Sequence, residues 1–204
     1  MAEAPRRALL LLAPALLAAC ATDGPELRPL PSLVEGYAHL TPLRLNARDI
    51  VVEPPPLGPA RRVDPPAPVD PVAEMERMAR ERLFAAGPAG RAVFTIETAS
   101  LTRQRLSGGG FLFSPEERAT VVLRGRLEVQ GAEGGASGFA SAEVRRTATG
   151  PADGGETERA ATLVRRAMED MNVELEFQVR RNLRALLVTT PPGPGVTAEP
   201  LPPS

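Results

Sequence analysis

The sequence predicts an α+β domain with a four-stranded, mainly antiparallel sheet covered on one face by two helices, in the order β-α-β-β-β-α. Three observations predict this fold class. Segments that alternate apolar and polar residues fill the middle of the chain, a helical segment lies within their order, and a long helical segment follows them. We expect the domain to span residues 43–188, with a Pro-rich linker at 54–69 inside it.

The first strand is predicted within 43–53 (LRLNARDIVVE), because this segment ends in a β-branched run and is followed by three consecutive prolines. The first helix then begins at Asp70-Pro71, where a good N-cap residue precedes a proline at the first helical position. Gly87-Pro88 is predicted to stop this helix. Its apolar stripe consists of Val72, Met75, Ala79 and Leu83.

Three further strands are predicted at 92–101, 119–130 and 139–147. The second of them alternates apolar and charged residues, so one face is expected to join the core while the other meets water. The connection before it contains three glycines that lack the Lys-Ser or Lys-Thr of a phosphate-binding loop. Glu116 and Glu117 are interpreted as a solvated turn in this connection, not as an acid/base pair.

A long closing helix is predicted over 157–187, because its apolar residues keep one helical stripe. Acidic residues stand at its start and arginines near its end, as the helix dipole favours. Residues 189–204 are rich in proline and glycine and are predicted to be a disordered tail. The methionines of the two helices are expected to belong to the core and not to a promiscuous binding groove: Met75, Met78, Met168 and Met171.

The N-terminus is predicted to be an export signal. Arg6 and Arg7 precede an apolar run at 8–19, which is too short to cross a hydrocarbon core of about 30 Å but suits a signal peptide. The run ends in Leu17-Ala18-Ala19-Cys20, which resembles the lipobox of bacterial lipoproteins.

The lipobox resemblance implies that residues 1–19 are removed, that signal peptidase recognises Leu17, Ala18 and Ala19, and that Cys20 is lipidated. Cys20 is the only cysteine, so the mature chain cannot form an internal disulfide or a cysteine metal cluster. Acyl chains on Cys20 would hold the protein at a membrane, since each buried methylene contributes about 0.8 kcal/mol. There are two alternatives. The N-terminus could be an ordinary signal peptide in which Cys20 is incidental, or the chain could be a cytosolic protein with an apolar N-terminus.

Residues 20–42 are expected to form a flexible spacer between the lipidated cysteine and the domain. In lipoproteins an Asp after the cysteine commonly retains the protein at the inner membrane. Ala21 occupies that position here. The resemblance therefore implies an outer-membrane lipoprotein that faces the periplasm.

Composition argues against several function classes. All 24 basic residues are arginines, and they balance 25 acidic residues to a formal net charge of −1, so no whole-protein field favours nucleic acid. His39 is the only histidine and lies in the predicted spacer, where a catalytic triad would have an unstructured base. Neither a metal site nor a cofactor is expected, and we do not expect an enzyme.

Two groups of residues are candidates for contact with a partner protein or a lipid. The first is Phe111, Leu112 and Phe113, which follow the glycines of the 107–115 connection and which could instead tuck under the sheet edge. The second is Arg180, Arg181 and Arg184, which could bind an anionic headgroup or an acidic partner, or could serve the helix dipole alone.

Taken together, the chain resembles a class of small bacterial lipoproteins of unassigned activity. The match lies in the lipobox, in LRLNARDIVVE, in MERMARERLFAAGPAGRAVFTIETASL and in the long closing helix. By architecture the chain also resembles auxiliary lipoproteins of envelope transport systems, including those that assist lipopolysaccharide insertion or work beside lipid transporters.

This resemblance implies a non-enzymatic binding or accessory module of the cell envelope that docks onto a larger envelope protein. The sheet and the 107–115 connection are then expected to present the contact surface. A lipid carrier with an apolar cavity between the helices and the sheet is an alternative, and a hydrolase is a third possibility.

Overall fold

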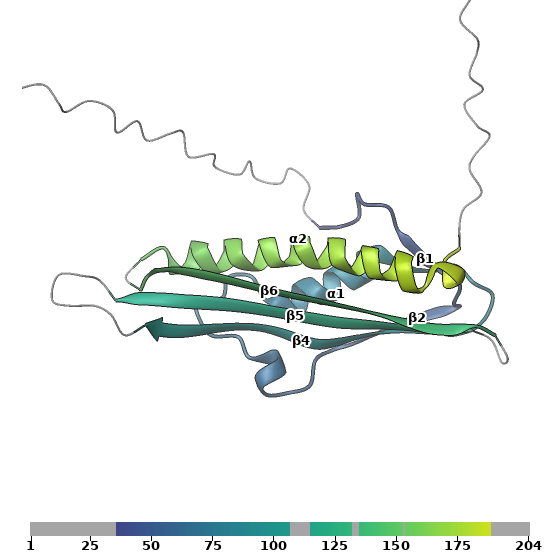
Figure 1. Cartoon of the computed structure of the whole chain (residues 1–204), viewed down its shortest axis with the longest axis horizontal. Coiled ribbons are helices and arrows are strands. Elements are labelled where there is room, and N and C mark those ends of the chain that lie inside the picture. The colour runs from purple at the N-terminus through teal and green to yellow at the C-terminus, as the bar shows by residue number, and fades with distance from the viewer. Residues whose placement is uncertain (1–35, 107–114, 132–134, 153, 189–204) are drawn as a thin grey trace, which may run out of the picture. The chain divides into compact units, whose positions relative to one another are not determined.

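The computed structural model of the chain describes residues 36–106, 115–131, 135–152 and 154–188. Within them, two helices lie on one face of a four-stranded sheet (Figure 1), in a single compact α+β domain. The predicted fold class is therefore confirmed. The predicted signal peptide and the predicted tail at 189–204 lie outside the described residues.

The sheet has the strand order β2-β4-β5-β6, in which the strands are Asp49–Glu53, Arg91–Leu106, Glu116–Gln130 and Ser137–Pro151. The β2–β4 pair is parallel, while the β4–β5 and β5–β6 pairs are antiparallel. The sheet is thus mainly antiparallel, as predicted. Its three long strands extend beyond their predicted ends, because pairing continues through polar residues that carry no apolar alternation.

The predicted first strand is broken in two, which corrects the sequence analysis. β1 (Leu43–Leu45) pairs in parallel with β3 (Leu83–Ala85) in a separate two-stranded sheet, whereas β2 joins the main sheet. Between them Ala47 is buried, and its carbonyl accepts a hydrogen bond from the amide of Gly87 at 3.0 Å. The break lets Leu43 and Leu45 be buried in the core, while Ile50 and Val52 of β2 pack against it.

The first helix, α1 (Pro71–Arg82), begins as predicted, since the Asp70 side chain accepts a hydrogen bond from the Val72 amide at 2.9 Å. It ends before Gly87-Pro88, which corrects the predicted stop. Leu83 still donates its amide to the Ala79 carbonyl, but its backbone is extended and starts β3.

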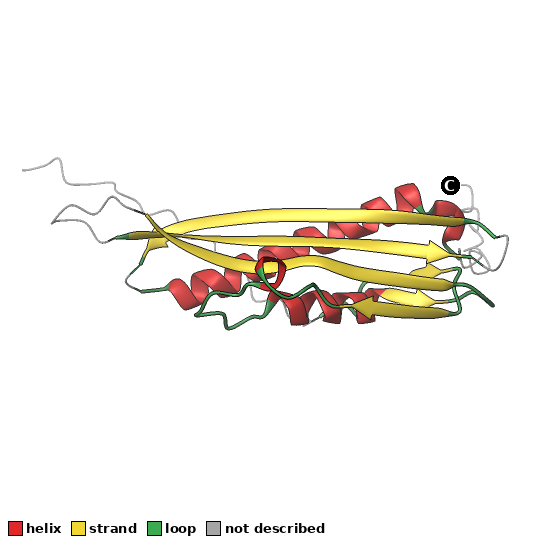
Figure 2. Cartoon of the chain, turned by 90° about the horizontal axis from the view of Figure 1, so that it is seen from below, coloured by secondary structure: helices red, strands yellow, loops and turns green. Residues whose placement is uncertain are grey.

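The closing helix, α2 (Glu156–Asn182), is followed by a short 3-10 helix, η2 (Arg184–Leu186), so the predicted helix at 157–187 ends earlier than expected. Its predicted stripe is buried against the sheet, and Figure 2 shows both helices behind the strands. The two methionines of α1 and the two of α2 are all buried in the core, as predicted. The stripe comprises Val164, Ala167, Met168, Met171, Leu175, Val179, Leu183 and Leu186.

The Pro-rich linker is docked onto the sheet. It contains the 3-10 helix η1 (Pro59–Arg61), and Val63 then forms a parallel bridge with Leu101 of β4. The Arg62 carbonyl accepts from the Leu101 amide at 2.9 Å, and the Asp64 amide donates to the Leu101 carbonyl at 2.8 Å. The linker therefore continues the edge of the sheet beyond the end of β2.

Candidate interaction surface

The predicted site residues divide into two sets. Leu17, Ala18, Ala19 and Cys20, and the triplet Phe111, Leu112 and Phe113, lie outside the described residues. The arginines at the end of α2 are described. Of the predicted contact residues, the structure therefore describes only those at the end of α2 and in η2.

The three arginines differ in what they contact. Arg180 donates from Nε to the Glu176 Oε1 atom at 2.7 Å, one helical turn earlier. The Arg181 guanidinium lies 6.0 Å from the centroid of the Phe177 ring, within the range of a cation–π contact. Arg184 is exposed at the start of η2. The structure therefore does not gather them into one anion-binding fork.

Two apolar side chains beside these arginines face solvent. Val173 is 67% exposed and Phe177 is 54% exposed, and they stand one helical turn apart on the side of α2 that faces away from the sheet. Together with Arg181 they form what we call the outward patch of α2. Two exposed apolar side chains beside a cation make this side of α2 a candidate contact site.

The outward patch was missed in the sequence analysis, although a signal for it exists. Phe177 lies midway between the buried Leu175 and Val179, so the helical period that buries those two residues turns Phe177 outward. A large apolar residue that is out of phase with the core stripe marks an exposed site.

A buried arginine lies between α2 and the other elements. Arg82, at the end of α1, is only 1% exposed and donates to the Glu176 carboxylate and to the Thr41 carbonyl. Partial burial of Glu176 opposes its ionisation, but hydrogen bonds from Arg180 and Arg82 outweigh this and lower its pKa. Arg82 of α1 thus links α2, through Glu176, to the segment before β1, through Thr41.

The segment 36–42, predicted as the end of a flexible spacer, packs on α1. The Tyr37 amide donates to the Glu81 carboxylate, and the Arg77 guanidinium lies 6.0 Å from the centroid of the Tyr37 ring. Burial, together with the negative charge of Glu74, raises the pKa of the Tyr37 phenol. The chain therefore enters the domain along α1.

A second buried arginine holds the opposite end of the sheet. Arg103 of β4 binds the Glu117 carboxylate and donates to the carbonyls of Pro66 and Glu156, at 2.8 and 3.3 Å. Glu116 and Glu117 lie within β5, so their interpretation as a solvated turn is wrong. Glu116 is exposed, whereas Glu117 is the ion-pair partner of Arg103.

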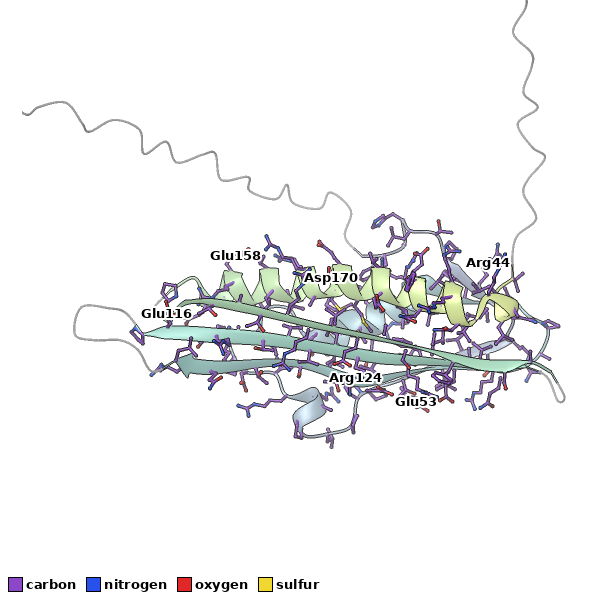
Figure 3. The ribbon with its side chains drawn as sticks, in the orientation of Figure 1. Arg44, Glu53, Glu116, Arg124, Glu158 and Asp170 are labelled. Atoms are coloured by element: carbon purple, nitrogen blue, oxygen red, sulfur yellow. The ribbon has the colours of Figure 1, made fainter. Side chains whose placement is uncertain are left out.

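The charged rows of the sheet face solvent as predicted. Arg124 of β5 lies on the side away from α2, whereas Asp170 belongs to the helix layer (Figure 3). Arg124 pairs with Glu143 of β6, with 2.7 Å between Nη2 and Oε2. Both side chains are exposed, so this face is a solvated surface, and such exposed pairs contribute little to stability.

The surface of the described domain is hollowed at two places that we consider as sites. One, of about 340 Å³, is lined by polar residues that include Arg48, Asp49 and Arg91, and the other, of about 200 Å³, lies beside Arg126 and Phe139. Neither lies between α2 and the sheet, where methionine and leucine side chains fill the space.

His39 is exposed in the turn at 36–40. Within the described ranges, no three His, Cys, Asp or Glu residues are grouped so that they could hold a metal ion. Among the same residues, no helix combines the length and the apolar character needed to cross a membrane.

Comparison with known proteins gives matches among solved structures only. No family model matches the chain, and no curated protein matches its sequence. A minor lipoprotein from Acinetobacter baumannii is 11% identical with a TM-score of 0.37, over 72% of this chain and 99% of that one. Rare lipoprotein B from Shewanella oneidensis is 15% identical with a TM-score of 0.40, over 65% and 95%.

An uncharacterized lipoprotein B from Nitrosomonas europaea is 15% identical with a TM-score of 0.39, over 74% of this chain and 91% of that one. The solved structures to which this chain is similar thus include several bacterial lipoproteins.

Proposed function

We propose that this chain is a lipid-anchored lipoprotein of the bacterial envelope that acts as a non-enzymatic binding or accessory module. The observation that carries the proposal is the lipobox Leu17-Ala18-Ala19-Cys20 at the end of a short apolar run, with Cys20 as the only cysteine of the chain. Lipidation of Cys20 gives this cysteine a role, and the acyl chains tether a water-exposed domain to the membrane.

The proposed location is the outer membrane, with the domain in the periplasm. Ala21 supports this location, because it leaves out the Asp that commonly retains lipoproteins at the inner membrane. Gly36 lies sixteen residues after Cys20, so a fully extended tether would reach at most roughly 55 Å from the membrane. The domain therefore works within that distance of the bilayer, on envelope partners or on the membrane itself.

The proposed mode of action is docking. The buried arginines Arg82 and Arg103 are committed to holding the fold together, through carboxylates and carbonyls that are already in use. The outward patch of α2, in contrast, offers apolar area and a cation without a packing role. Its composition of an aromatic, an aliphatic and an arginine residue is that of a protein contact site.

Lipidation is tested by labelling cells with palmitate and separating membranes from soluble material. We expect the parent chain to take up label and to sediment with outer membranes. Cys20→Ser should take up no label and keep its signal peptide, while Ala21→Ser should behave as the parent does. Processing and sedimentation of Cys20→Ser like the parent would refute the tether.

Docking is tested by crosslinking in cells with Val173→Ser combined with Phe177→Ser. We expect this pair of changes to reduce crosslinking to an envelope protein at least tenfold, since truncation of an aromatic hot spot costs about 2 kcal/mol or more of binding free energy. Phe84→Ser is the matched control, because Phe84 is also an exposed aromatic but lies on β3. Equal loss with both variants would contradict the assignment to the outward patch.

The predicted contact triplet is tested in the same assay. Phe111→Ser with Phe113→Ser should reduce crosslinking and leave helical circular dichroism unchanged if the triplet contacts a partner. Unfolding of the domain by this variant would assign the triplet to the core instead.

A further inference from the structure

β6 ends the sheet with a long free edge. It is the last strand in the order β2-β4-β5-β6, and no described segment pairs with its outer side. Its register with β5 runs without a shift from Ser137 to Pro151, and the only proline is the last residue. Natural proteins usually interrupt or cover such an edge, because its open backbone groups invite another strand.

The backbone groups that point outward can be identified. The Gly131 amide donates to the Ala136 carbonyl at 3.0 Å, and the Ala152 amide donates to the Pro115 carbonyl at 2.8 Å. Hydrogen-bonded pairs alternate along an antiparallel ladder, so the even-numbered residues of β6 bond to β5 and the odd-numbered residues direct N–H and C=O outward. Every odd-numbered side chain on the strand is also exposed.

We propose that the outer edge of β6 pairs with β6 of a second copy of this chain, antiparallel, about a two-fold axis at Val144. In this register Glu143 of each copy faces Arg145 of the other. Ser141 faces Thr147 of the second copy, and the odd-numbered residues exchange backbone hydrogen bonds across the axis. The two four-stranded sheets join into one continuous sheet.

The charges on β6 favour this register over the two registers whose axes lie one residue away. An axis at Glu143 would set two glutamates opposite each other, and an axis at Arg145 would set two arginines opposite each other, and both arrangements are destabilising. With the axis at Val144, Glu143 lies between Arg124 of its own copy, at 2.7 Å, and Arg145 of the second copy. Arg145 has no ion pair among the residues that the structure describes, so the second copy would supply its carboxylate partner.

The shape of the strand also suits a copy of itself. The axis at Val144 is the midpoint of Ser137–Pro151, so the two strands overlap along their full length. Both helices lie on one face of the sheet and leave the strand edge without a described neighbour in the sheet plane (Figure 2). Main-chain pairing would supply affinity, and the Glu143–Arg145 contacts would fix the register.

The register is tested by cysteine substitution in the full chain, purified in a mild detergent and oxidised. Val144→Cys should form a disulfide-linked dimer, because facing residues of a pair without hydrogen bonds have Cα atoms about 4.5 Å apart, within disulfide range. Glu143→Cys and Arg145→Cys are matched controls. They should not cross-link with themselves, since their equivalents lie two residues further along the strand, and the parent chain controls for Cys20.

The charge pattern is tested by sedimentation of the same preparations. Glu143→Arg and Arg145→Glu should each weaken dimerisation by about tenfold, and the double swap should restore it, because opposite charges face each other again. Equal cross-linking at positions 143, 144 and 145, or equal sedimentation of the single and double swaps, would overturn the register. A Val144→Cys chain that stays monomeric, or that links only to a different protein, would overturn the second copy as the occupant.

Discussion

Arg82 is the charged side chain on which the most distant contacts of the domain converge. Its guanidinium is buried, and its partners are the Thr41 carbonyl and the Glu176 carboxylate. Removing it leaves both acceptors without their buried donor. We predict that Arg82→Met lowers the free energy of unfolding by about 2 kcal/mol, less than for a fully buried pair because Glu176 keeps Arg180.

Denaturant unfolding of the mature chain measures this change. The matched control is Arg80→Met, because Arg80 stands two residues away in α1, is exposed, and forms an i,i+4 pair with Glu76. It should change the free energy of unfolding by less than about 0.5 kcal/mol. A similar loss in both variants would mean that Arg82 acts through helix propensity and not through its buried contacts.

Glu176 makes the stability of the domain depend on pH. Its pKa in the folded state lies below the ordinary value of 4.5, so the unfolded chain binds more protons in the acid range. The stabilisation is present above the unfolded pKa and is lost as the pH falls through the folded one. We predict that Glu176→Gln flattens the fall in unfolding free energy below pH 5, measured by denaturant melts at several pH values. A slope equal to that of the parent would contradict this.

Sequence reasoning at the residue scale succeeds where the cause is local. The Asp70 cap depends on an amide two residues away, and the methionine stripe depends on the helical period. Arg82 could not be singled out, because its partners lie 41 and 94 residues away in the chain. Its neighbours Arg77 and Arg80 look the same in sequence and remain partly exposed.

At the scale of elements, the existence of the long strands and of both helices was predictable, while their ends were not. β4 and β5 extend through polar residues such as Arg103 and Glu117, which pair across the sheet and have no apolar period. The break between β1 and β2, and the short β3, depend on where the chain can bury Ala47 and Leu83. That choice is set by tertiary packing and not by propensity.

The contact of α2 with the sheet depends on a glycine in β5. A methyl group at Gly125 would lie 2.7 Å from Cζ of Phe94 and 3.2 Å from Cε of Met171, both in the buried core. We predict that Gly125→Ala destabilises the domain by about 1–3 kcal/mol, as overpacking of a filled core does. Thermal and denaturant unfolding test this, with Arg118→Ala on the solvent face of the same strand as a control that should stay within about 0.5 kcal/mol.

At the scale of the whole molecule, composition distinguishes the domain from its connections but does not say which connections are docked. The Pro-rich linker bridges to Leu101, and the segment at 36–42 packs on α1, although both have the composition of loose chain. The candidate contact site also depends on tertiary placement. The out-of-phase Phe177 is visible in the sequence, but its exposure can be read only once the stripe of α2 is placed on the sheet.

Because the Pro-rich linker is docked on β4, its resistance to proteolysis should depend on the contacts that hold it. Asp64 holds the linker to β4, because its side chain accepts from the Arg103 amide at 2.9 Å and from Arg62 Nε at 2.7 Å, and the Arg62 contact lowers its pKa. Asp64→Ala removes these bonds, at a cost of about 1–2 kcal/mol to local closure. We predict that trypsin cleaves this variant after Arg61 and Arg62 at least fivefold faster than the parent chain, with the rates measured by mass spectrometry.

The control is Glu53→Ala, which removes only a hydrogen bond from the Thr95 hydroxyl and should leave the cleavage rate unchanged. Equal cleavage rates in the parent chain, Asp64→Ala and Glu53→Ala would show that Asp64 does not hold the linker.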